Sequence, residues 1–91
     1  MSLATAELAS ALGLGESELI QEAMRSLLLE KKRQVLETKL EILARYGATS
    51  LTDLEAKIAD GAVVEHPAWE DLIVAENLNA RLGELDEYLG R

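Results

Sequence analysis

The chain has the length of one domain: 91 residues, with 17 acidic and 9 basic side chains and a formal net charge of −8. It has no cysteine and one histidine, which excludes a disulfide framework, a thiolate metal site, a cysteine nucleophile and a histidine pair. Ala, Glu, Lys, Leu and Arg supply 53 of the 91 residues, a composition typical of long helices. No apolar run approaches the about 18 residues of a membrane span. We therefore expect an all-α protein of the cytoplasm.

Glycine and proline divide the chain into four helical segments. Gly13 and Gly61 stand where helices should end, because glycine adopts the left-handed conformation without a Cβ penalty. Pro67 suits the first turn of a helix, where its missing N–H is not needed. Ser50 or Thr52 is expected to cap the third segment. The predicted helices cover residues 3–12, 16–46, 51–60 and 67–90.

The second segment predicts the longest helix, and its apolar face changes direction. A continuous helix of this length would measure roughly 46 Å, against a radius of gyration of about 12–13 Å for a compact chain of this size. Apolar residues from Leu19 to Leu28 cluster on one side, and those from Val35 to Tyr46 cluster more than a quarter turn away. The helix therefore either breaks near Glu30–Gln34 or projects from the rest of the chain.

The fourth segment also carries two apolar faces. Trp69, Leu72 and Ile73 lie together. Nearly opposite them lies a heptad-like row of leucines, namely Leu78, Leu82, Leu85 and Leu89. Two opposed faces on one helix are difficult to bury within a small monomer, so we expect a homo-oligomer or a protein partner.

Sequence motifs offer little support for catalysis. The paired carboxylates, such as Glu70 with Asp71, are typical of solvated helix faces. His66 beside Glu65 fits no metal-binding spacing, and no phosphate-binding glycine loop is present. We expect no enzyme activity, no metal and no cofactor.

One cluster of basic residues is a candidate for contact with nucleic acid. It comprises Arg25, Lys31, Lys32 and Arg33. The alternative is that these side chains form helix-spaced ion pairs with Glu30, Glu37 and Glu41. The net charge of −8 would oppose the approach of DNA.

Residues 7–25 resemble the two helices of ribbon-helix-helix proteins. The matching features are Leu8 and Leu12, the turn at Gly13, and the run Ser17-Glu18-Leu19-Ile20 with Glu22-Ala23-Met24-Arg25 after it. The resemblance implies an intertwined homodimer whose shared core would contain Leu8, Leu12, Leu19, Ile20, Ala23 and Leu27. Many members of that family are antitoxins, in which a DNA-binding dimer precedes a tail that wraps a toxin. The basic N-terminal strand with which members read DNA has no counterpart in residues 1–6.

The charge is distributed unevenly along the single domain. Residues 1–46 hold 6 basic and 7 acidic side chains, whereas residues 47–91 hold 3 basic and 10 acidic side chains. We interpret residues 1–46 as a helix-turn-long-helix dimerisation region and residues 47–91 as an acidic helical region.

These features predict an antitoxin-like interaction module that neutralises a basic partner protein. The predicted partner surface pairs an apolar group with surrounding carboxylates, namely Trp69, Leu72 and Ile73 with Glu65, Glu70, Asp71 and Glu76. Two alternatives stay open: a DNA-binding autorepressor of ribbon-helix-helix type, and a structural helical oligomer without a partner.

Overall fold

The structure is a computed structural model that describes residues 4–91. It is all-α with a long central helix, as the sequence predicts, and contains no strand within the described residues. The helices are α1 (Thr5–Ala11), α2 (Glu16–Arg45), α3 (Leu51–Ala59) and α4 (Glu65–Leu89). Leu3, within the predicted first helix, lies outside the described residues. No helix within residues 4–91 is long and apolar enough to cross a membrane.

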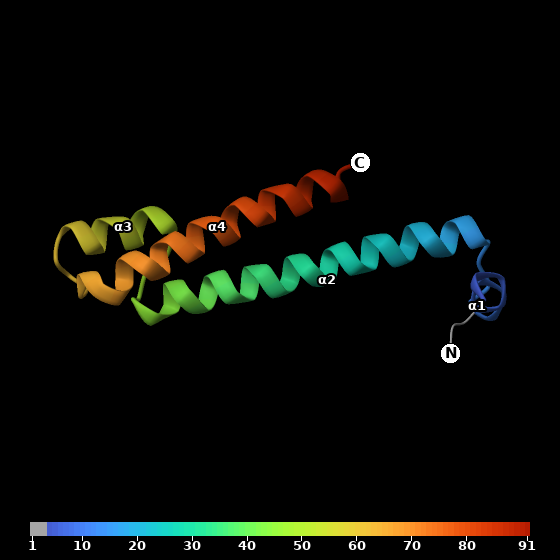
Figure 1. The fold of residues 1–91 in the computed structure, drawn as a ribbon, viewed down its shortest axis with the longest axis horizontal. Helices are drawn as coiled ribbons and strands as arrows, with labels where there is room; N and C mark the ends of the chain where they lie inside the picture. The colour runs from blue at the N-terminus through green and yellow to red at the C-terminus, as the bar shows by residue number, and fades with distance from the viewer. Residues whose placement is uncertain (1–3) are drawn as a thin grey trace.

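The molecule is an elongated helical hairpin (Figure 1). α2 runs without a break, α4 returns alongside it, and α1 lies at the end of α2 farthest from α3. The radius of gyration is 19.2 Å, against about 12 Å for a compact chain of this length. Of the two arrangements that the sequence allows for the second segment, the structure therefore has the projecting helix.

Polar contacts define how α2 and α4 pair. At the closed end the Tyr46 hydroxyl donates a hydrogen bond to the Asp71 carboxylate. Farther along, the Lys39 ammonium donates to the Asn79 side-chain oxygen at 2.9 Å. Nearer the open end, the Lys32 ammonium lies 2.6 Å from a carboxylate oxygen of Asp86. Residue numbers fall on α4 as they rise on α2, so the two helices are antiparallel.

The core lies at the closed end, where α2, α3 and α4 meet. Leu54 and Leu72 are the largest fully buried side chains, with exposures of 0% and 1%. Around them pack Leu43, Ile58 and Ala68. α3 covers only this end of the hairpin (Figure 1), which leaves the rest of the α2–α4 pair without a third helix on that side.

The chain itself covers most of the two opposed apolar faces of α4. Leu82 and Leu85, from the predicted leucine row, are 9% and 6% exposed, because α4 packs along α2 of the same chain. Leu72 is covered by the α3 end of the hairpin. Ile73, the neighbour of Leu72, is 55% exposed. The expectation that both faces require a partner is therefore wrong for Leu72 and the leucine row.

The helix ends follow the predicted local signals. Gly13, Gly47 and Gly61 have φ values of +71°, +61° and +72°, in the left-handed region where glycine avoids a Cβ clash. The Ser50 hydroxyl accepts a 3.0 Å hydrogen bond from the Asp53 backbone N–H, so Ser50 caps α3. Within α4, His66 has non-helical backbone angles, and the regular part of the helix starts at Pro67.

Candidate functional site

The α4 outer face is the first candidate surface, and we define it by Trp69 and Ile73 with Glu65, Glu70 and Glu76 around them. Trp69 is 39% exposed and Ile73 is 55% exposed, one helical turn apart. Leu72 does not belong to this surface because it is 1% exposed within the core. The structure thus brings together two of the three apolar residues predicted to meet a partner.

The carboxylates predicted to surround that surface have two different roles. Glu65, Glu70 and Glu76 are exposed on α4. A Glu65 carboxylate oxygen accepts a 3.1 Å hydrogen bond from the Trp69 indole N–H, which orients the ring beside a negative charge. Asp71 instead accepts from Tyr46 and lies 3.5 Å from the Arg45 guanidinium. Asp71 therefore joins α4 to the end of α2 rather than extending the outer face.

The second candidate surface is the projecting part of the molecule. Of the six residues that the resemblance assigns to a dimer core, Ala23 is exposed and Leu19 is half-buried in the single chain. The remaining four have exposures of 37%, 58%, 50% and 59%, for Leu8, Leu12, Ile20 and Leu27 respectively. Large apolar side chains of α1 and of the N-terminal half of α2 are thus left exposed in the single chain.

The basic cluster is largely occupied by contacts within the chain. The Arg33 guanidinium donates to Glu30 at 2.8 Å and to Glu37 at 2.8 Å, and this contact lowers the pKa of Glu30 to about 2. The Arg25 guanidinium donates to the Leu89 carbonyl at 3.3 Å. Together with the ion pair of Lys32, these contacts support the interpretation of the cluster as intramolecular pairing; Lys31 has no ion pair within residues 4–91.

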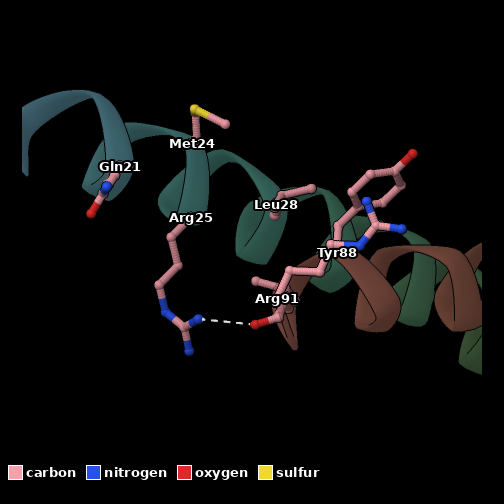
Figure 2. A pocket seen from close by; sticks show the side chains of 7 residues that line it. Gln21, Met24, Arg25, Leu28, Tyr88 and Arg91 are labelled. Atoms are coloured by element: carbon pink, nitrogen blue, oxygen red, sulfur yellow. Dashed lines mark hydrogen bonds between the residues drawn. The ribbon is translucent and has the colours of Figure 1, made fainter. Parts of the chain in front are cut away.

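A groove of about 600 Å³ lies where the end of α4 meets α2 (Figure 2). Its apolar lining comes from Met24, Leu28 and Leu89, and Arg25 lies at its edge. Tyr88 lines the α4 side of the groove. The Arg91 guanidinium lies 4.7 Å from the centroid of the Tyr88 ring. Sequence patterns did not predict this groove, because it depends on where α4 stops along α2.

The described residues offer neither a cluster of metal-ligating side chains nor a buried charged group. Between residues 4 and 91, no group of three His, Asp or Glu side chains could hold a metal ion. No charged or polar residue of that part of the chain is buried. The candidate sites that we consider are the exposed apolar surfaces, where Trp69, Ile73, Ile20 and Leu27 are 39% to 59% exposed.

The fold and its surfaces define the class as an elongated all-α hairpin protein with uncovered apolar faces. More particularly, the chain belongs to the Uncharacterized protein MJ0235 family, whose model matches residues 1–90. Neither the curated proteins nor the solved structures yield a significant match to the chain.

Proposed function

We propose that this protein is an antitoxin-like interaction module that binds a basic partner protein through the α4 outer face and neutralises it. The observation that carries the proposal is an exposed apolar pair, Trp69 and Ile73, surrounded by exposed carboxylates. Apolar anchors with a charged rim are the usual composition of a protein interface, and tryptophan is enriched among the residues that dominate binding energy.

The charge of α4 favours a basic partner. Along the same helix, Glu70, Glu84 and Glu87 have side-chain exposures of 73%, 62% and 70%, although Glu84 and Glu87 pair with Arg81 and Arg91. These carboxylates belong to residues 47–91, where acidic groups outnumber basic groups by 10 to 3. Such a field steers an oppositely charged partner and suppresses association with acidic proteins.

Neutralisation would follow from masking. The Trp69 ring and the Ile73 side chain would enter an apolar groove of the partner, while Glu65, Glu70 and Glu76 pair with basic residues at its rim. Leu72 and Asp71 contribute indirectly because they hold α4 against α3 and α2.

The test is affinity purification of the protein from its native host at modest salt, with mass identification of the bound material. We expect one stoichiometric basic protein that is retained by the wild type and lost with Trp69→Ala/Ile73→Ala. Tyr88→Ala is the matched control, since Tyr88 is an aromatic residue of α4 that is 55% exposed outside the outer face. Circular dichroism must show that both variants remain helical. Retention of the same basic protein by the folded double variant would contradict the proposal, and a host purification that yields no partner would favour a structural oligomer.

The DNA-binding alternative has weaker support. Arg25, Lys32 and Arg33 already contact acceptors within the chain, and phosphate contacts would have to replace these pairs. Binding to the promoter of the protein's own operon that weakens with salt would favour this alternative over the module proposed above.

A further inference from the structure

The N-terminal half of α2 carries an apolar stripe that its own chain leaves largely exposed. Ile20, Met24 and Leu27 are 50%, 60% and 59% exposed. At about 100° per residue they share one side of the helix with Ala23, Glu16 and Lys31, within an arc of about 100°. We define these six residues as the α2 stripe. Figure 1 shows the N-terminal part of α2 extending past the C-terminal end of α4. The other end of the stripe lies beside the last turns of α4, where Lys32 pairs with Asp86.

The α2 stripe is complementary to a second α2 stripe that runs antiparallel to it. Its midpoint falls between Ala23 and Met24, and Ile20 and Leu27 lie at equal distances on either side. Glu16 and Lys31 are also equidistant from this midpoint, and their charges are opposite. An antiparallel copy therefore places Ile20 against Leu27 and Glu16 against Lys31, twice across one two-fold axis. Within residues 4–91, neither Glu16 nor Lys31 takes part in another ion pair.

The surface area of the chain agrees with one covered interface. The accessible surface is 6501 Å² for a mass of 9.9 kDa, about 1,300 Å² more than the about 5,200 Å² expected of a compact monomer of that mass. A standard interface buries about 800 Å² on each partner. The excess is therefore large enough for one such interface on each chain.

We propose that a second copy of this chain binds the α2 stripe, so that two α2 helices pack antiparallel about a two-fold axis at Ala23 and Met24. The small Ala23 side chain lets the helices approach at the crossing point. The interface contains no residue of the α4 outer face. The dimer can therefore be tested independently of the partner protein proposed above. The dimer presents one α4 outer face on each chain.

Oligomeric mass tests whether a second copy is the occupant. Sedimentation equilibrium should give twice the 9.9 kDa of one chain for the wild type. Leu27→Glu should raise the dissociation constant by about 100-fold or more, because it places two carboxylates in the apolar seam, with helicity retained in circular dichroism. Leu40→Glu is the matched control: Leu40 is 53% exposed on another side of α2, and this variant should stay dimeric. A wild-type chain that stays monomeric, or a folded Leu27→Glu variant that dimerises like the wild type, would overturn the proposal.

Single cysteines test the orientation, because the chain has no cysteine of its own. A mixture of Ile20→Cys and Leu27→Cys chains should form a disulfide-linked dimer on mild oxidation, whereas each variant alone should not. In addition, Glu16→Lys and Lys31→Glu should each weaken the dimer, and the double swap should restore it. Disulfide formation by Leu27→Cys alone, or no rescue in the double swap, would exclude the antiparallel arrangement.

Discussion

The Tyr46 hydroxyl at the end of α2 donates a hydrogen bond to the Asp71 carboxylate in α4, across the closed end of the hairpin. Asp71 also lies 3.5 Å from the Arg45 guanidinium. The hydrogen bond to Asp71, together with desolvation and the charge of that carboxylate, raises the pKa of Tyr46 above its ordinary value of 10.0. This contact therefore links the pairing of α2 and α4 to the protonation of one phenol.

That link predicts a loss of stability at alkaline pH. Because the pKa of Tyr46 is higher in the folded than in the unfolded chain, the stabilisation is fully present below about pH 10 and is lost as the pH rises through the raised value. Urea unfolding midpoints should thus fall more steeply above about pH 10 for the wild type than for Tyr46→Phe. Tyr88→Phe, which removes an exposed hydroxyl, should follow the wild type. Parallel curves for the wild type and Tyr46→Phe would show that the contact contributes nothing.

Two neighbouring residues of α4 should respond very differently to truncation. Leu72→Ala should lower the free energy of unfolding by about 3 kcal/mol, because Leu72 is 1% exposed and its removal leaves a cavity between α3 and α4. Ile73→Ala should cost less than about 1 kcal/mol, since Ile73 is 55% exposed. Chemical denaturation of the two variants measures the difference. Equal losses would contradict the assignment of Leu72 to the core and of Ile73 to the outer face.

Gly83 lies within α4 at a position where the surrounding atoms leave room for a side chain. A Cβ added there would meet no atom within 4 Å, so Gly83→Ala should raise the free energy of unfolding by about 1 kcal/mol. Gly61→Ala should lower it by about the same amount, because Gly61 has a φ of +72°. Thermal and urea unfolding distinguish the two signs. A destabilised Gly83→Ala variant would indicate that another chain approaches α4 closely at this position.

The cap of α3 separates two candidates that the sequence leaves open. Ser50→Ala should cost about 1 kcal/mol, because the Ser50 hydroxyl accepts the hydrogen bond from the Asp53 N–H. Thr52→Ala should change stability little, as Thr52 is exposed and follows the cap. The urea midpoints of both variants check this assignment; a larger effect at Thr52 than at Ser50 would reverse it.

Much of the helical architecture could be predicted because its signals are local. The predicted ends at residues 46 and 60 differ by one residue from the observed ends at Arg45 and Ala59. Left-handed glycines and a serine cap act within one helical turn, so neighbouring residues suffice to recognise them.

The candidate sites were predicted less completely. Trp69 and Ile73 are exposed, but Leu72 lies in the core although it belongs to the same apolar group. Periodicity cannot separate these residues, because all three lie on one broad side of α4, and α3 covers only part of that side. The groove beside Tyr88 was missed since its two walls come from residues 60 or more positions apart.

The sequence by itself determined an acidic all-α chain with four helices, because composition, apolar spacing and helix-end residues are local properties. The tertiary structure decided which element covers each apolar face. It placed the leucine row of α4 against α2 and left the α2 stripe uncovered. The physical reason is that the hydrophobic effect favours burial of an apolar face but does not specify which segment buries it. That choice depends on where the chain reverses and on how far α4 extends along α2.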